Sequence, residues 1–304
     1  MPSSTSLDLR LSHAELTASL EPFVQSRYDG DDQGWTAMAQ RRIDRLRAGA
    51  RPGPTDAVPV SEATDQAAAD RIALDWFESK FAMEPGDSPF EWAGHRFFAR
   101  GITTSRVHLL VLARLVERLQ PASVLEVGCG SGINLLTLAA MFPRVAFSGI
   151  DVNGISVQRA HAVQRLDRLP PILERFCPDP VADPTAHRRV TVGHHDARAL
   201  PFADAQFDLV FTRLALERVQ ASRDTVLGEL RRVSRGHVAM IEAFREWNAD
   251  GLRRDYMTAQ RYLDLAVAEL PKLGLDPVYV FEDLPHKLTH RPVLVVTRPH
   301  AVAP

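Results

Sequence analysis

The fold of this chain is decided by one stretch, Val124-Leu125-Glu126-Val127-Gly128-Cys129-Gly130-Ser131-Gly132-Ile133-Asn134. Its first four residues are apolar or β-branched apart from one carboxylate, which predicts a short buried strand. Three glycines then alternate with small residues, as in a tight turn whose backbone approaches a ligand closely. Residues Ile133 to Met141 are apolar and favour helix, so a helix is predicted directly after the turn. This order of elements indicates a nucleotide-type site at the carboxyl end of a parallel strand.

The spacing of the glycines narrows the class of ligand. A dinucleotide fingerprint is G-x-G-x-x-G, whereas Gly128, Gly130 and Gly132 give G-x-G-x-G, and Glu126 stands two residues before the first of them. A carboxylate at this turn would repel a pyrophosphate and attract an ammonium group, which S-adenosylmethionine carries along with its sulfonium. Accidental spacing in another Rossmann-like turn is the alternative, and this motif alone leaves it open.

Here the chain resembles the class I S-adenosylmethionine-dependent methyltransferases, whose first motif is E/D-x-G-x-G-x-G. The resemblance covers about residues 103 to 298, and Leu200-Pro201-Phe202 and Phe207-Asp208-Leu209-Val210 match the ubiquinone-biosynthesis-like, small-molecule branch. It implies an α/β, Rossmann-like fold with a mostly parallel seven-stranded sheet in the order 3-2-1-4-5-7-6. Helices are expected on both faces, with the last two strands as an antiparallel edge. The implied cofactor is S-adenosyl-L-methionine.

Two acids further along the chain extend the resemblance. Asp151 ends the second predicted strand, twenty-three residues after Gly128, where a Rossmann-type sheet places the acid that binds ribose hydroxyls; capping the next helix is its alternative role. Asp196 and Ala197 follow the third strand, where the family's acid and the next N–H contact adenine. Arg213, at the end of the fourth strand, is a candidate partner of the cofactor carboxylate or of a substrate anion. The resemblance thus implies these cofactor-binding residues: Glu126, Gly128, Cys129, Gly130, Gly132, Asn134, Asp151, Val152, Asp196, Ala197 and Arg213.

Methyl transfer needs a base only if the acceptor is protonated at the working pH. His195, Glu217 and Glu242 are the candidates, and for Glu242 a structural pairing with Arg245 is the alternative. Relatives often have a histidine where this chain has Arg218, so a histidine base cannot be carried over to that position. The fourth strand is followed by neither an acid-rich end nor an N/D-P-P-Y/F sequence. This favours a metal-independent enzyme, without a metal site, that acts on something other than a base amine.

Residues 1–102 are predicted to form an N-terminal helical extension, and residues 103–304 the methyltransferase domain. The segment 82–102 is expected to be a loop with several aromatic residues, and a helix is expected over 253–270, where Pro271 stops it. The extension either caps the substrate pocket or packs against the domain without contacting the substrate. Both interpretations stay open. Further helices are indicated over 11–20, 36–48, 61–81 and 103–119.

The composition is that of a globular protein without a strong charge. The 304 residues include 45% hydrophobic and 24% charged residues, and the net charge of -2 gives no field that would hold a polyanion. Two cysteines, Cys129 and Cys177, form no disulfide framework, and neither a signal peptide nor a membrane span is expected, so we expect a cytoplasmic protein.

These observations predict O-methylation of a small-molecule acceptor by in-line transfer. No membrane partner is expected, nucleic acid is disfavoured, and the oligomeric state is left unspecified. The alternatives are N-methylation of a small amine, a protein or RNA, and a cofactor-binding scaffold without catalysis. A nicotinamide dehydrogenase is disfavoured by the missing G-x-G-x-x-G.

Overall fold

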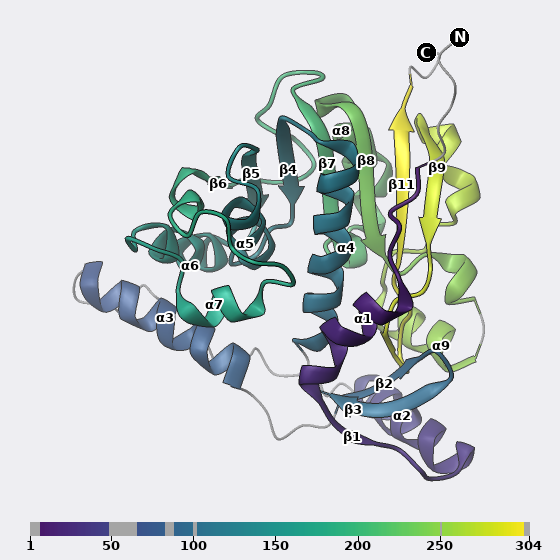
Figure 1. Cartoon of the computed structure of the whole chain (residues 1–304). Coiled ribbons are helices and arrows are strands. Elements are labelled where there is room, and N and C mark those ends of the chain that lie inside the picture. Colours follow the sequence, from purple (N-terminus) through teal and green to yellow (C-terminus); the bar gives the residue numbers. More distant parts are fainter. Residues whose placement is uncertain (1–6, 49–65, 83–87, 100–101, 250, 301–304) are drawn as a thin grey trace.

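Seven strands form the central sheet of the computed structural model, which describes residues 7–48, 66–82, 88–99, 102–249 and 251–300. Their order is β6-β5-β4-β7-β8-β11-β9 (Figure 1). The strands are β4 Ser123–Val127, β5 Ala146–Asp151, β6 Thr191–His194, β7 Phe207–Arg213, β8 Ser234–Glu242, β9 Leu275–Phe281 and β11 Val293–Pro299. The first five are parallel, and β11 runs antiparallel to both of its neighbours. The predicted α/β class and the order 3-2-1-4-5-7-6 are confirmed.

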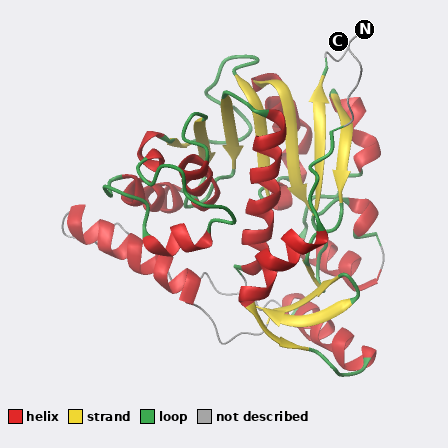
Figure 2. Ribbon diagram, viewed as in Figure 1, coloured by secondary structure: helices red, strands yellow, loops and turns green. Residues whose placement is uncertain are grey.

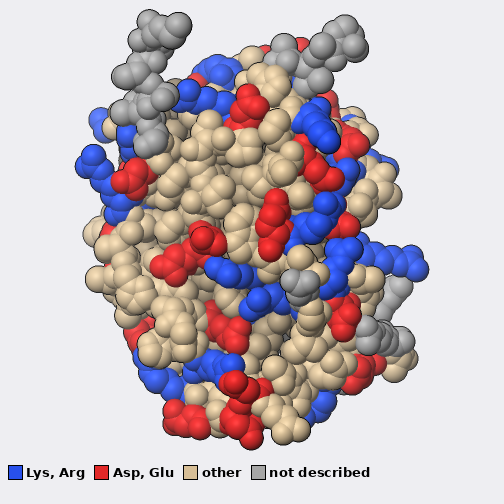
Figure 3. All heavy atoms as spheres, turned by 90° about the vertical axis from the view of Figure 1, so that its right-hand side faces the viewer, with Lys and Arg blue, Asp and Glu red and all other residues tan. Residues whose placement is uncertain are grey.

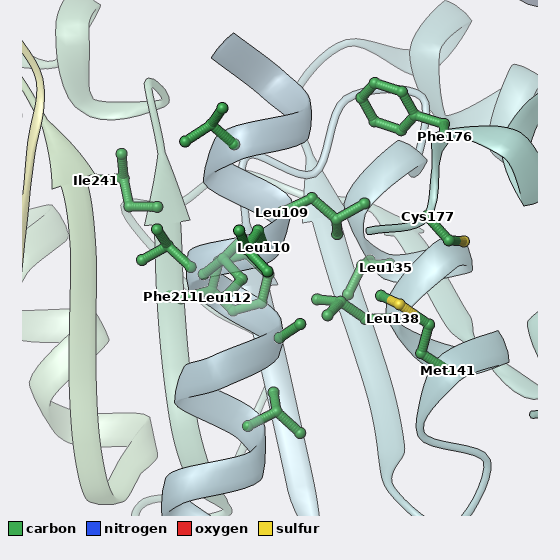
Figure 4. Packing of buried hydrophobic residues seen from close by; sticks show 14 of the residues in the cluster. Leu109, Leu110, Leu112, Leu135, Leu138, Met141, Phe176, Cys177, Phe211 and Ile241 are labelled. Carbon is green, nitrogen blue, oxygen red and sulfur yellow. The ribbon is translucent and has the colours of Figure 1, made fainter. Parts of the chain in front are cut away.

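Helices cover both faces of this sheet (Figure 2). On one face, Leu109 and Leu135 from two helices share a buried cluster with Phe211 of β7 (Figure 4). On the other face, Leu227 is buried in a second cluster with Leu125 of β4. Full burial of each such side chain contributes about 1.5–3 kcal/mol. The helices are α4 Thr103–Leu119, α5 Ile133–Met141, α6 Gly154–Gln164, α7 Pro171–Phe176, α8 Arg223–Val233 and α9 Gly251–Gln260.

The helix predicted over residues 253–270 is shorter than expected. It ends at Gln260, and Pro271 lies in a separate 3-10 helix. Arg261 adopts a left-handed backbone conformation with φ 55°, and the N–H of Tyr262 donates at 3.0 Å to a carbonyl of the last helical turn. A left-handed residue of this kind closes a helix without proline. The predicted stop at Pro271 is therefore wrong.

The described part of the N-terminal extension contains strands as well as helices. Its elements are α1 His13–Leu20, α2 Asp32–Arg47, α3 Gln66–Ala82, β1 Val24–Arg27, β2 Ser88–Trp92 and β3 His95–Ala99. Most of the segment predicted as a loop over 82–102 is thus a hairpin, in which Phe90 and Phe97 are buried. Ala93 and Gly94 supply the two positive φ angles, 51° and 77°, of its two-residue turn. The first residues of the helix predicted over 61–81 lie outside the described ranges.

The extension is joined to the C-terminal part of the chain. β10 His286–Lys287 pairs with β2, which completes a four-stranded sheet in the order β1-β3-β2-β10. Trp92 Nε1 donates to the Asp283 carboxylate at 2.7 Å, and α2 packs on α9. In Figure 1 this small sheet lies beyond the carboxyl ends of β7 and β8. The extension therefore adjoins the edge at which open α/β sheets bind their ligands.

The surface that carries β9 has side chains of both charges. Figure 3 shows Lys and Arg interspersed with Asp and Glu there, without a continuous field of one sign on this face. Within the described ranges, none of the helices combines the length and the apolar composition that a membrane span requires.

Candidate functional site

A cavity of about 520 Å³ lies at the carboxyl ends of β4, β5, β6 and β7. Its lining includes one predicted residue from each of these strand ends: Gly128, Asp151, Asp196 and Glu217. The parallel arrangement brings them together, although they are far apart in the sequence. Cavities of this size hold a single cofactor or small ligand.

All three glycines of the turn adopt positive φ angles: 81° at Gly128, 54° at Gly130 and 77° at Gly132. A Cβ on Gly128 would lie 2.3 Å from the Cβ of Ala215, whereas a Cβ on Gly130 would meet no atom of the described chain within 4 Å. Gly128 is therefore needed by the fold itself, and Gly130 borders open space. Cys129 between them is buried, and burial raises the pKa of its thiol, so this residue is not a reactive thiolate.

Asp151 joins the glycine turn to β5. Its Oδ2 accepts from the N–H of Gly130 at 2.7 Å, and its Oδ1 accepts from the N–H of Asn153 at 2.7 Å. The N-cap of α6 is Asn153, whose side chain accepts from two backbone N–H groups of that helix, so Asp151 is not the cap. Val152 lines the cavity, and the residue as a whole is 69% exposed.

Glu126 is buried next to the turn, at 1% exposure. Its Oε1 accepts from Asn134 Nδ2 at 2.7 Å, and its Oε2 has no hydrogen-bond partner among the residues described. Burial raises the pKa of this carboxyl to about 8, while the hydrogen bond from Asn134 and the charge of Arg213 oppose that shift. An unpaired buried acceptor is costly, so this position favours a bound group that donates to it.

Arg213 forms hydrogen bonds with two side chains of α4. It is not among the lining residues of the cavity. Its Nε donates to His108 Nδ1 at 3.0 Å, and its Nη2 donates to Ser105 Oγ at 2.6 Å. Burial, Arg213 and His290 lower the pKa of His108 well below its usual value, so this ring is neutral. With Nδ1 accepting, its proton resides on Nε2, which finds no partner in the described chain.

Asp196, Ala197 and His195, all named from the sequence, line the cavity after β6. Arg198 holds the Asp196 carboxylate, with its Nε 3.0 Å from both oxygens. These hydrogen bonds lower the pKa of Asp196 to about 2. Sequence reasoning did not single out Arg198, and a ligand that binds Asp196 must compete with its guanidinium.

Glu242, at the end of β8, binds the loop after β7, and Glu217 lies in that loop. Glu242 is fully buried, and its Oε1 accepts from two backbone N–H groups directly after β7, at 3.0 and 3.3 Å. The pairing with Arg245 that sequence reasoning left open is wrong, because Arg245 Nε binds Asp264 at 2.6 Å. Burial raises the pKa of Glu242 to about 8, with a further contribution from Glu217. Glu242 thus holds the loop that carries Glu217, which itself lines the cavity.

His290 lies beside Glu217, two tyrosines pack on His290, and sequence reasoning missed all three. His290 Nε2 lies 3.8 Å from Glu217 Oε1, and His290 Nδ1 lies 3.2 Å from Thr289 Oγ1. The Tyr256 ring stacks on His290 with centroids 5.8 Å apart, and the Tyr262 ring meets it edge-on at 6.4 Å. Tyr256 comes from α9, Tyr262 from the segment after α9, and His290 from the segment after β10, so no local motif links them to Glu217. Within the described ranges, no group of three or more His, Cys, Asp or Glu side chains is arranged to hold a metal ion.

Part of the chain matches proteins that are already known. Residues 125–240 match the family model described as "Methyltransferase domain". Malonyl-[acyl-carrier protein] O-methyltransferase of Legionella pneumophila is 28% identical over 134 residues, and the match spans 42% of this chain but only 40% of that protein. A SAM-dependent methyltransferase from Methanosarcina mazei is similar in structure, with 16% identity, 59% of this chain and 93% of that chain covered, and a TM-score of 0.43. A SAM-dependent methyltransferase from Aquifex aeolicus is 19% identical in sequence. That match covers 58% of this chain and 81% of that chain, with a TM-score of 0.40.

Proposed function

We propose that this chain, which is a class I S-adenosylmethionine-dependent methyltransferase, methylates an oxygen atom of a small-molecule acceptor without a metal ion. The observation that carries the proposal is the cavity of about 520 Å³ between the glycine turn, Asp151 and Asp196. The O-methyltransferase among its relatives supports oxygen as the accepting atom. Both cysteines are free and buried, which suits the cytoplasm that we propose as its location.

In this proposal the residues around the turn hold the cofactor. The Asp151 carboxylate would accept from the ribose hydroxyls at the end of β5. Glu126 Oε2, which is buried and unpaired in the described chain, would accept from the cofactor ammonium group. Asp196 and the N–H of Ala197 would bind the adenine ring, with Arg198 yielding part of its hold on Asp196.

The cofactor, when bound, would supply an activated methyl group, whose carbon an acceptor oxygen would attack in line with the leaving thioether sulfur. The protein's own residues then hold that oxygen in position, which provides much of the acceleration. Of the three predicted base candidates, His195 and Glu217 line the cavity, whereas Glu242 is fully buried. We propose that Glu242 contributes by fixing the loop of Glu217 and does not contact the acceptor.

Transfer of tritium from methyl-labelled S-adenosylmethionine to a panel of phenols, alcohols, carboxylates and amines tests this function. We expect the label on an oxygen-bearing acceptor, with no loss of activity in the presence of a chelator. Label found only on amines, or on a protein or RNA fraction, would support N-methylation instead. Calorimetric binding of S-adenosylhomocysteine without transfer to any class of acceptor would indicate a scaffold.

A further inference from the structure

We infer that Glu217 and His290 form a proton-accepting pair, and that the acceptor is therefore a hydroxyl compound, an alcohol or a phenol, that loses its proton during methyl transfer. This inference rests on the proposed methyl transfer and deepens it. It names the residue that contacts the acceptor proton, the residue that acts through it, and the chemical class of the substrate.

The pair joins two distant parts of the chain at the cavity. Glu217 lies in the 3-10 turn Leu216–Arg218 that follows β7, and His290 follows β10. Glu217 Oε1 and His290 Nε2 are 3.8 Å apart, with side chains 17% and 12% exposed. Glu217 is among the lining residues of the cavity, and His290 is not. Glu217 is therefore the catalytic member that touches the acceptor, and His290 is a positioning residue.

The surroundings direct one nitrogen of His290 toward Glu217. Tyr256 stacks on the imidazole at an interplanar angle of 14°, and Tyr262 meets it edge-on at 81°. Thr289 Oγ1 lies 3.2 Å from Nδ1. Since one ring face and Nδ1 are engaged in this way, His290 presents Nε2 to the carboxylate.

Titratable and charged groups from three other elements act on the pair. Glu242 from β8 and Arg213 from β7 both feel the charge of Glu217, and His108 from α4 feels the charge of His290. Glu242 is neutral at pH 7 because burial raises its pKa to about 8. Arg213 is a cation, and His108 is neutral because burial lowers its pKa. Neutral Glu242 thus adds no second buried anion beside Glu217.

The proton transfer balances in charge and in bonds. The acceptor O–H bond breaks, its proton passes to Glu217 and then to His290 Nε2, and the oxygen lone pair forms the bond to the methyl carbon. The electrons of the broken carbon–sulfur bond remain on sulfur, so the sulfonium becomes a neutral thioether. A carboxylate–imidazolium pair remains, which releases the proton to water after the product leaves. An acceptor carboxylate is already ionised at neutral pH and would gain nothing from such a pair.

The kinetic test uses Glu217→Gln and His290→Gln, with a hydroxyl acceptor identified in the tritium assay. We expect kcat to fall by about 10²–10⁴ in Glu217→Gln and by less in His290→Gln, with KM and S-adenosylhomocysteine affinity unchanged. The loss should shrink as the pH approaches the acceptor's own pKa, because the acceptor then ionises in water. The matched controls are His300→Gln and Asp276→Asn, a histidine–carboxylate pair at 2.9 Å outside the cavity lining, and these should keep the wild-type profile.

A second measurement needs no acceptor. Long-range proton–nitrogen NMR follows the imidazole of His290, assigned by its disappearance in His290→Gln. Loss of the carboxylate in Glu217→Gln should move the titration of His290 to lower pH, whereas Asp276→Asn should leave it in place. An unmoved titration in Glu217→Gln would overturn the pairing.

The kinetic outcomes separate this inference from the proposed function. An equal loss of kcat at every pH, or a lower affinity for S-adenosylhomocysteine, would assign the pair a structural role and overturn the inference. Transfer restricted to carboxylates or amines would overturn the substrate class while methyl transfer stands. A wild-type chain that binds no S-adenosylhomocysteine would overturn the proposed function, and this inference with it.

Discussion

The glycine turn and the Glu217–His290 pair lie at the same edge of the sheet, yet they are assembled in different ways. The turn belongs to one continuous stretch, residues 124–134, and its backbone N–H groups donate to the end of β5, at the Ile150 carbonyl and the Asp151 carboxylate. The pair combines a loop after β7 with a segment close to the C-terminus, and Tyr256 of α9 packs on it. The cofactor side thus depends on backbone geometry, and the acceptor side on side chains brought together by tertiary packing.

This difference predicts how substitutions act on the cofactor side and on the acceptor side. Positive φ angles and direct backbone hydrogen bonds leave little freedom, so substitutions at the turn should act on binding in an all-or-none way. Side chains brought together by packing can be exchanged with graded effects on rate and pH dependence. The following substitutions probe the cofactor side, from the largest expected effect to the smallest.

Replacement of Gly130 by valine is expected to abolish S-adenosylhomocysteine binding. Its Cβ would meet no atom of the described chain within 4 Å, so the side chain would occupy the open space beside the turn. The left-handed φ of 54° would cost about 1–2 kcal/mol of stability as well. Calorimetric titration measures the affinity, and circular dichroism shows whether the variant is folded.

Gly128→Val is the companion variant for this experiment. Its Cβ would lie 2.3 Å from the Cβ of Ala215, so the melting temperature should fall more than in Gly130→Val. A folded Gly130→Val that binds the cofactor product with wild-type affinity would show that the ligand does not lie against this turn.

Glu126→Gln should change how stability depends on pH. The pKa of Glu126 is about 8 in the folded chain against an ordinary 4.5, so the unfolded chain ionises first. The neutral Glu126 carboxyl stabilises the folded chain fully when the pH is below the pKa of the unfolded chain. This stabilisation is lost as the pH rises toward the pKa of the folded chain. Glutamine removes this slope, so the variant should gain a few kcal/mol on wild type between about pH 5 and about pH 8.

Urea unfolding at those two pH values measures the difference for Glu126→Gln. Glu282→Gln, at a side chain that is 60% exposed, is the matched control and should follow the wild-type pH dependence. If the unfolding free energies of wild type and Glu126→Gln changed equally with pH, Glu126 would have the same pKa in the folded and unfolded chains.

Asp151→Ala should weaken cofactor binding by about 1–3 kcal/mol, because the ribose hydroxyls and the N–H of Gly130 both lose an acceptor. Asp183→Ala is its control. Asp183 makes the same kind of local contact, accepting from the N–H of Thr185 at 2.8 Å, and is not a lining residue of the cavity. Calorimetry with S-adenosylhomocysteine should therefore find a loss in the first variant and none in the second. Equal affinities would remove Asp151 from the ribose site.

The cofactor side was predictable from sequence because its determinants are local. The helix predicted over Ile133–Met141 has those bounds in the structure, and the strand before the turn is extended by only one residue, Ser123. Strand order followed from the family resemblance, and Asp151 from its spacing to Gly128. The hairpin at 88–99 was not predicted. Its turn contains a glycine and its strands bury alternate aromatic residues, which are both signals of a hairpin. The many aromatic residues of this segment obscured that alternation.

Sequence reasoning named Glu217 but could not predict which side chains surround it, for a physical reason. Tyr256 of α9 stacks on His290, and Leu263, shortly after α9, donates its N–H to the Glu217 carbonyl. The sequence pattern extended this helix to Leu270 and so could not place these contacts. His108 lies in an apolar helix whose pattern indicates core, and only tertiary packing reveals Arg213 beside it. Such contacts carry no periodicity and no spacing that a single sequence can show.

Val152→Ala should give the smallest effect. The side chain is already 69% exposed, so shortening it costs the folded chain almost nothing and the melting temperature should not change. A bound nucleoside would cover it, however, and the lost apolar contact is worth on the order of 1 kcal/mol, or about fivefold in Kd. Val278→Ala on β9, at a side chain that is 37% exposed and not part of the cavity lining, should leave both quantities unchanged. If Val152→Ala also left Kd unchanged, the nucleoside would not lie over the end of β5, and the ribose role of Asp151 would have to be abandoned even if the glycine turn still held the cofactor.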